Sequence, residues 1–180
     1  MYASPVSRRL TLELVAPATR YRESFSRALC EHRAEGLPWW IGGDLELAAH
    51  DFAAFVAKRL AAASPRDDGV LPKTHLWAIA DDMYVGRIGI FHGLDDGLRR
   101  EGGHIGYDTV PSFRGRGVAT EMLRQALPVA RALGLGEVLL TCDETNAASI
   151  RVIEANGGVL RETRVLDARR PVKRYYWITL

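Results

Sequence analysis

Hydrophobic and polar residues follow two different periods along the chain, and each change of period marks a boundary between elements. Between residues 103 and 110 they alternate with a period of two, which predicts a strand, and Pro111 ends it because proline has no N–H for a sheet. From Val118 to Leu133 apolar residues recur every three or four positions, which predicts an amphipathic helix. Pro128 lies within this helix and should kink it or shorten its regular part. The middle of the chain is therefore predicted to be a strand, a glycine-containing turn and a helix.

The same two periods predict the elements on either side. Further strands are expected at residues 10–15, 75–80, 84–92, 137–142, 159–166 and 174–180, and further helices at residues 19–36, 44–63 and 147–155. Thr19 and Asp44 are the predicted N-caps of the first two helices, and His32 and Leu60 are expected on their inward faces. Residues 94–102 are predicted to form a solvated loop.

The order of these elements also predicts how the strands pair. Short connections predict two antiparallel hairpins, one from the strands at 75–80 and 84–92 and one from the last two strands. A strand, helix and strand in succession normally form a right-handed crossover, so the strands at 103–110 and 137–142 are expected to be parallel. These elements predict an α/β (α+β) domain.

Composition narrows the possible classes of protein. The 180 residues predict a single domain, 1–180, with a substantial core. With 24 basic and 22 acidic residues the net charge is +2, which argues against a dedicated nucleic-acid surface. No apolar run is long enough to span a bilayer and the first residues lack the core of a signal peptide, so we expect a cytoplasmic protein. Cys30 and Cys142 are predicted to be free buried thiols, and the five histidines show no ligand spacing, so no metal site is expected.

The turn Arg114-Gly115-Arg116-Gly117 has the chemistry of an anion site. Its glycines let the backbone bend sharply and let a ligand approach closely. The first N–H groups of the following helix have no internal partner and lie at the positive end of the helix dipole. The guanidinium groups of Arg114 and Arg116 suit phosphate oxygens, so we expect a phosphorylated ligand here.

Three phosphate-binding patterns compete for this turn. A Walker loop needs Lys and then Ser or Thr after its last glycine, but Val118 and Ala119 stand there. A dinucleotide fingerprint would need a third glycine where Thr120 stands, and it would need an earlier, more apolar strand. The third pattern is Arg or Gln, two residues, Gly, one residue, then Gly or Ala, and residues 114–119 fit it.

The third pattern resembles the acetyl-CoA-binding motif of the GNAT (Gcn5-related) N-acetyltransferases, with the strand, the Val110-Pro111 pair, the glycine turn and the helix in the same order. The resemblance implies a mixed, mostly antiparallel sheet of six to seven strands flanked by helices, with a parallel pair splayed at the cofactor. It also implies acetyl transfer from acetyl-CoA to a primary amine. The implied diphosphate site comprises Arg114, Gly115, Arg116, Gly117, Val118, Ala119 and Thr120.

A second segment extends the resemblance towards the C-terminus. Asn146-x-x-Ser149, followed by a short helix that ends at Gly157, is similar to the GNAT segment whose Asn contacts the pantetheine arm. Asn146 is also a predicted helix cap. Many family members have a Tyr where Ile153 stands, and that phenol is often assigned as the acid for the leaving thiolate. Ser149 takes that role in our prediction, as in the branch resembling ribosomal-protein N-terminal acetyltransferases, with Tyr107 in reserve; water is an alternative.

The amine also needs a base, and the family places one on the strand before the glycine turn. His104 and Asp108 share one face of the predicted strand, and the unperturbed pKa of His104 suits a base; structural packing of His104 is the alternative. Backbone amides around Thr109 and Val110 are expected to polarise the thioester carbonyl.

The acceptor is left open as a small-molecule amine or a peptide N-terminus. The first two helices and residues 167–173 are expected to wall it, and a homodimer is possible. Trp39 and Trp40 are predicted to anchor a loop, with a place in the acceptor pocket as the alternative. A non-catalytic acyl-CoA-binding module and, more weakly, NAD binding are the competing hypotheses.

Overall fold

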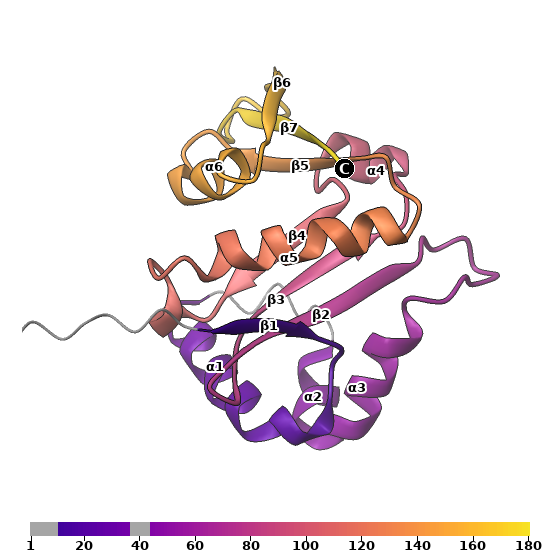
Figure 1. Ribbon diagram of the computed structural model, residues 1–180, viewed down its shortest axis with the longest axis vertical. Helices are drawn as coiled ribbons and strands as arrows, with labels where there is room; N and C mark the ends of the chain where they lie inside the picture. The colour runs from indigo at the N-terminus through magenta and orange to yellow at the C-terminus, as the bar shows by residue number, and fades with distance from the viewer. Residues whose placement is uncertain (1–10, 37–43) are drawn as a thin grey trace, which may run out of the picture.

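A computed structural model of the chain describes residues 11–36 and 44–180, and these form two sheets with helices between and around them (Figure 1). Sheet A has the strand order β1 (Leu12–Val15), β2 (Lys73–Ala80), β3 (Met83–Phe91) and β4 (Ile105–Thr109). Sheet B has the order β5 (Glu137–Asp143), β7 (Lys173–Thr179) and β6 (Val159–Arg164). The helices are α1 (Arg22–Ala34), α2 (Leu45–His50), α3 (Phe52–Ala61), α4 (Asp96–Arg100), α5 (Val118–Ala132) and α6 (Ala147–Glu154).

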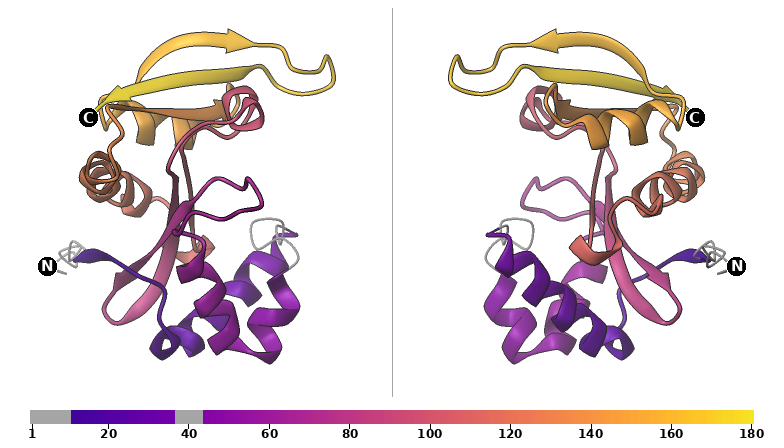
Figure 2. Two further views of the ribbon diagram at one scale, coloured as in Figure 1. Left: turned by 90° about the vertical axis from the view of Figure 1, so that its right-hand side faces the viewer. Right: turned by 90° about the vertical axis from the view of Figure 1, so that its left-hand side faces the viewer.

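Helices cover both faces of sheet A (Figure 2). The helix α5 packs through Met122, Leu123 and Ala126 on one face and lies between this sheet and sheet B (Figure 1). On the opposite face, α1 and α3 bury an aromatic cluster in which Phe25 stacks on Trp77 with ring centroids 5.2 Å apart. Because strand residues alternate between faces, neighbouring residues of β2 to β4 belong to two different cores.

Most predicted elements are present. Both hairpins are antiparallel, and Asp81 and Asp82 form the first turn with positive φ angles of 48° and 58°. The helix α5 continues through Pro128 to Ala132. Residues 94–102 contain the helix α4, which the prediction of a simple loop missed, and Asp95 caps it by accepting a bond from the Leu98 amide.

The predicted caps of the first two helices were wrong. Thr19 begins a short 3-10 helix, Thr19–Tyr21, and α1 starts only at Arg22. Asp44 precedes α2 without capping it, because its carboxylate pairs with Lys58 at 2.6 Å and Arg59 at 2.9 Å. Asp51 interrupts the predicted helix 44–63 and caps α3 by accepting a 2.9 Å bond from Ala54 N.

Some residues predicted to be buried are buried in the structure, and others are exposed. His32 is buried as expected, but Leu60 is 46% exposed. Cys142 is buried, whereas Cys30 is exposed, so the prediction of two buried thiols was wrong for Cys30. Trp39 and Trp40 lie outside the described residues.

The sheet divides between β4 and β5, as the expected splayed pair required. The parallel pairing itself is not formed in the part of the chain that the structure describes, since every ladder there is antiparallel. An isolated antiparallel bridge joins Gly103 to Leu140, and His104 N donates to Leu139 O at 2.7 Å. Gly103, at φ 74°, turns the chain here, and a Cβ at this position would lie 2.3 Å from Leu139 O. The backbone just before β4 therefore contacts β5 at one point. Beyond this point the two strands are not paired, and β4 is an edge strand of sheet A.

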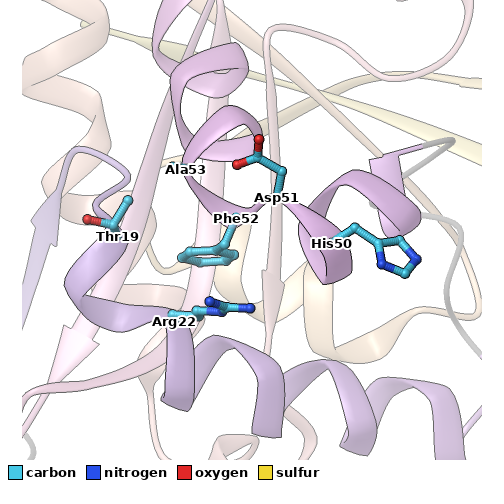
Figure 3. Close-up of a pocket in the computed structure, with 6 residues that line it drawn as sticks. All are labelled: Thr19, Arg22, His50, Asp51, Phe52 and Ala53. Atoms are coloured by element: carbon cyan, nitrogen blue, oxygen red, sulfur yellow. The ribbon is translucent and has the colours of Figure 1, made fainter.

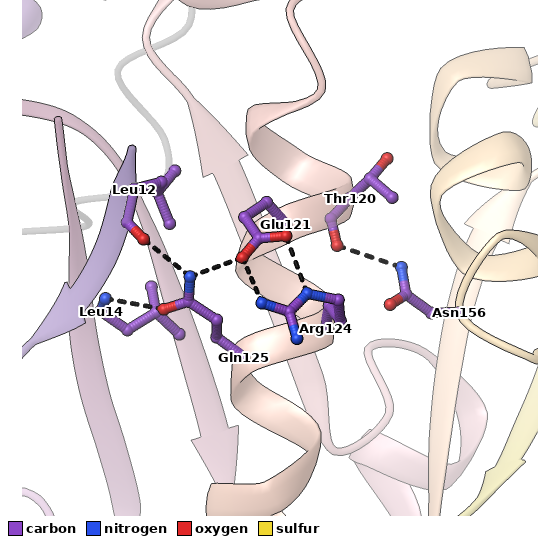
Figure 4. Close-up of polar contacts among 7 residues, drawn as sticks. All are labelled: Leu12, Leu14, Thr120, Glu121, Arg124, Gln125 and Asn156. Atoms are coloured by element: carbon purple, nitrogen blue, oxygen red, sulfur yellow. Dashed lines mark hydrogen bonds and ion pairs between the residues drawn. The ribbon is translucent and has the colours of Figure 1, made fainter. Parts of the chain in front are cut away.

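Polar side chains fix α5 between the two sheets (Figure 4). Gln125 accepts a bond from Leu14 N at 3.1 Å and donates to Leu12 O at 2.8 Å, which satisfies part of the outer edge of β1. Asn156 donates to Thr120 O at 3.2 Å and joins α5 to the end of α6. Gln125 itself is half-buried against β1.

Candidate functional site

The glycine turn opens the N-terminus of α5. Gly117 stands at the N-cap position with φ 80°, a left-handed conformation that favours glycine, and no side chain caps the helix. The first intrahelical bond runs from Glu121 N to Gly117 O, so the amides of Val118, Ala119 and Thr120 have no earlier carbonyl of the helix to bond. A Cβ on Gly115 or Gly117 would meet nothing within 4 Å. These amides, at the positive end of the α5 dipole, can therefore receive a phosphate oxygen.

The two arginines of the turn have different surroundings. Arg114 donates from Nε to Thr109 O at 3.2 Å and pairs with Glu35 of α1 at 2.8 Å. Arg116 is exposed and lies over the Phe113 ring, 5.4 Å from its centroid. In this arrangement Arg114 braces the turn, and Arg116 is the better placed of the two to meet an anion.

The helix α1 holds the connection between β4 and α5 at a second point. Glu31 accepts bonds from both Ser112 N, at 2.9 Å, and Ser112 Oγ, at 3.0 Å. Together with the pair between Glu35 and Arg114, this contact joins α1 to the residues that precede the glycine turn. The sequence offered no local signal for it, because the two partners are 81 positions apart.

The exposed edge of β4 offers backbone groups beside this turn. Val110 N donates to Val85 O at 3.0 Å, so this amide is already used within sheet A. In an antiparallel ladder alternate residues direct their backbone groups to the same partner, which turns the N–H of Thr109 towards the other side of β4. Of the two amides expected to polarise a carbonyl, only that of Thr109 points away from β3.

Asn146, Ser149 and Tyr107 come together where β4 faces α6. Asn146 caps α6, accepting a 3.0 Å bond from Ser149 N with its side-chain oxygen, as predicted. The Tyr107 hydroxyl donates to Ser149 O at 3.5 Å, the long limit for such a bond. Burial raises the pKa of Tyr107 to about 12.

His104 lies in a different environment from Asp108. It precedes β4 and is buried, its Nδ1 accepts a 2.9 Å bond from Leu139 N, and its ring packs edge-on against Trp177. Burial lowers its pKa. His104 therefore ties β4 to β5, which is the structural role considered as the alternative.

Asp108 faces α1 and a buried histidine. His32 Nε2 lies 3.1 Å from Asp108 Oδ2, with side-chain exposures of 1% and 25%. Burial raises the pKa of Asp108 and lowers that of His32. Arg87 stands directly opposite Asp108 on β3. The sequence placed His32 only among core residues, and its pairing with Asp108 depends on how α1 lies on the sheet.

A pocket of about 350 Å³ lies elsewhere, at the junction of α2 and α3 (Figure 3). It is lined by Thr19, Arg22, His50, Asp51, Phe52 and Ala53. Asp51, Phe52 and Ala53 begin α3, which packs on the face of sheet A opposite α5. The pocket is therefore separate from the glycine turn.

Within residues 11–36 and 44–180, no three His, Cys, Asp or Glu side chains are grouped so that they could hold a metal ion. None of the helices in the described part of the chain is long and apolar enough to cross a membrane.

One family model matches most of the chain. The family model described as acetyltransferase (GNAT) domain matches residues 9–159. No curated protein matches the chain.

Several solved structures share the fold. RimJ of Mycobacterium smegmatis, in complex with CoA-disulfide, is 21% identical with a TM-score of 0.71, over 95% of this chain and 84% of that one. The Salmonella typhimurium acetyltransferase that modifies the N-terminal serine of ribosomal protein L7/L12 is 18% identical, with a TM-score of 0.63 and 98% of both chains covered. The microcin C7 self-immunity acetyltransferase MccE, in complex with acetyl-CoA and AMP, is 13% identical with a TM-score of 0.67, over 94% of this chain and 92% of that one.

Proposed function

Because the chain belongs to the GNAT family of acetyltransferases, which use acetyl-CoA as co-substrate, we propose that it transfers an acetyl group directly from acetyl-CoA to a primary amine. The observation that carries the proposal is the uncapped N-terminus of α5 at Gly117, in a chain whose sheet divides between β4 and β5 and whose Asn146 caps α6 after β5. The single domain 1–180 contains all the residues to which the proposal gives a role.

The cofactor fits the residues of the glycine turn. The amides of Val118, Ala119 and Thr120, with Arg116, bind the diphosphate, and Gly115 and Gly117 leave open the space that a Cβ would fill. Arg114 holds the turn through Thr109 and Glu35. The side-chain NH₂ of Asn146 contacts the pantetheine arm while its oxygen caps α6. Acetyl-CoA supplies the activated acetyl thioester.

Residues on opposite faces of β4 take different parts in the proposed reaction. Asp108 faces α1 and takes a proton from the ammonium group of the acceptor, which leaves a neutral amine to attack. Burial raises the pKa of Asp108 towards that of a base useful near neutral pH. The nitrogen forms a bond to the acetyl carbon as the carbon–sulfur bond breaks, and the Thr109 amide donates to the carbonyl oxygen. Tyr107 faces the other way, towards Ser149.

The leaving sulfur is stabilised on the α6 side. With a pKa of about 12 the Tyr107 hydroxyl stays protonated and donates a hydrogen bond to the thiolate, which receives, through water, the proton that the acetylated nitrogen loses. The backbone oxygen of Ser149 contacts Tyr107, and the Ser149 hydroxyl is assigned a supporting part in the same role. We assign His104 a structural role, since its Nδ1 already accepts the Leu139 amide.

The acceptor is a small-molecule amine or a peptide N-terminus. Relatives of the same fold differ on this point, since one modifies the N-terminal serine of a ribosomal protein and another is a self-immunity enzyme bound to AMP. Thiol release from acetyl-CoA with a panel of amines and peptides, with products identified by mass, tests the proposal. Acceptor-dependent turnover is expected. Coenzyme A binding without turnover across the panel would favour the non-catalytic module.

A further inference from the structure

The face of sheet A that carries Asp108 also carries charged side chains that the proposed transfer does not use. The antiparallel register places Arg87 opposite Asp108, and it places Gly89 opposite both Gly106 and His75. Directly opposite residues share a face of a sheet, so these five residues lie on the same face. Lys73 lies two residues before His75 on β2 and therefore also shares this face.

The helices leave part of this face open. The aromatic cluster under α1 and α3 includes the buried Trp77, whereas Lys73 and His75, further towards the start of β2, are only half-buried. Gly106 is exposed, and a Cβ there would meet nothing within 4 Å. A Cβ on Gly89 would lie 2.6 Å from Lys73 Cε and 3.4 Å from Lys73 Nζ, so glycine at this position lets the Lys73 chain lie along the sheet. Bare backbone therefore separates Lys73 from Asp108.

Three cations, Lys73, Arg87 and Arg59, influence one another around this bare stretch. Arg59 of α3 is offset by Asp44 at 2.9 Å, and Asp108 lies opposite Arg87, but no carboxylate is paired with Lys73 among the ion pairs of the described residues. Burial, together with the charges of Arg87 and Arg59, lowers the pKa of Lys73 to about 8. The same burial and the charge of Lys73 lower the pKa of His75 to about 3, so this imidazole is neutral at pH 7.

We propose that the acceptor carries an anionic group close to its amine, and that Lys73 and Arg87 bind this group while the amine lies at Asp108. The inference rests on the proposed acetyl transfer and adds the class of acceptor. Strand residues rise by about 3.3 Å each, so Gly106 lies roughly 7 Å along β4 from Asp108. A carboxylate a few atoms from the amine spans this distance. It can belong to a small amino acid or to an acidic side chain near a peptide N-terminus.

Matched acceptors test the proposal, each pair differing only in the charge of one group. The small-molecule pair is 4-aminobutanoate and 4-aminobutanamide, and the peptide pair is Ser-Glu-Ala-Ala and Ser-Gln-Ala-Ala. In at least one pair, we expect kcat/KM for the acid to be at least about tenfold higher than for the amide. A tenfold ratio corresponds to a difference of about 1.4 kcal/mol in activation free energy. The pair that shows the preference identifies the source of the anion.

Two variants with the same change in charge locate the preference. Lys73→Met keeps the chain that covers Gly89 and should bring the ratio of acid to amide close to one. Lys58→Met removes an exposed lysine that pairs with Asp44 and should keep the ratio of the wild type.

A second measurement needs no variant. In the wild type the ratio should fall as pH rises through about 8, because Lys73 loses its proton.

The outcomes separate this inference from the proposed function. Equal turnover of acid and amide by the wild type would overturn the anionic acceptor and leave acetyl transfer intact. A preference that persists in Lys73→Met, or one that does not change across pH 8, would overturn the role of Lys73. Absence of turnover with all four acceptors and with the wider amine panel would instead refute the proposed function.

Discussion

Single residues of β4 separate the two halves of the proposed chemistry. Asp108 and Tyr107 are neighbours in sequence, but alternation along the strand points one to α1 and the other to α6. An amine can therefore approach from one side of the strand while the sulfur leaves on the other. This separation follows from the period of a strand and needs no catalytic residue from a distant loop.

Replacement of the proposed base is the first prediction. Asp108→Asn should lower kcat by about 10² or more, because a positioned base typically contributes a factor of 10² to 10⁴. The KM for acetyl-CoA should stay within about twofold, since Asp108 faces α1 and not the glycine turn. Steady-state kinetics with a saturating acceptor provides the measurement. Asp96→Asn, on the exposed surface of α4, is the control, and similar losses in both variants would contradict the assignment.

Replacing either of two glycines with similar φ angles should destabilise the protein, but by different amounts. Gly103→Ala should lower the free energy of unfolding by more than about 2 kcal/mol, because it adds a clash with Leu139 O to the strain of a positive φ. Gly134→Ala, at φ 86° with nothing within 4 Å, should cost only about 1 kcal/mol. Urea unfolding of both variants compares them. Equal costs would show that the bridge between the sheets adjusts without penalty.

At the scale of elements, α5 is the part that both sheets share. Its apolar face packs on sheet A, Gln125 bonds the edge of β1, and Asn156 reaches it from the end of α6. The helix that presents the glycine turn is thus fixed at its N-terminal half from two sides. A stable position for the amides of Val118 to Thr120 follows from these contacts.

The Gln125 contacts predict a measurable loss. Gln125→Leu should lower the free energy of unfolding by about 1–3 kcal/mol, because Leu14 N and Leu12 O lose their partners at a half-buried edge. Arg124→Leu, one residue earlier, breaks only a surface pair with Glu121 and should change stability by less than about 1 kcal/mol. Denaturant titration measures both, and a larger loss in the control would contradict the role of Gln125.

At the scale of the whole molecule, folding places several histidines where a proton is unfavourable. Burial lowers the pKa of His32, His75 and His104, while the unfolded chain keeps values near 6.5. Below about pH 6.5 the unfolded state therefore binds more protons at these positions than the folded state. Their contribution to stability decreases as pH falls.

His75 isolates this effect, since its folded pKa is about 3. Compared with the wild type, His75→Gln should gain stability as the pH is lowered from 7 to 5, because glutamine takes up no proton in the unfolded chain. Unfolding free energies at the two pH values give the comparison. The exposed His50→Gln is the control. A difference between His75→Gln and the wild type that is independent of pH would show that His75 takes up its proton equally well in both states.

The sequence by itself determined most of the elements and the glycine turn, because both depend on short-range patterns. Period-two and helical spacing identified the strands and α5, and the glycine spacing at residues 114–119 identified the turn. Asn146 was identified as a cap because capping involves a partner only three residues away. The same local chemistry misplaced the caps at Thr19 and Asp44, where a 3-10 turn and two distant cations determined the outcome.

Only the tertiary structure decided which residues meet across the fold. Several contacts join segments that are far apart in the chain. His32 pairs with Asp108, and Glu31 accepts bonds from Ser112. The Val110 amide bonds to Val85 O, and His104 accepts a bond from the Leu139 amide. The shared face of Lys73, Arg87 and Asp108 depends on strand register, which packing sets over the whole sheet. Burial then shifted the pKa values of Lys73, Arg87 and Asp108, because desolvation is a property of the folded surroundings and not of the residue alone.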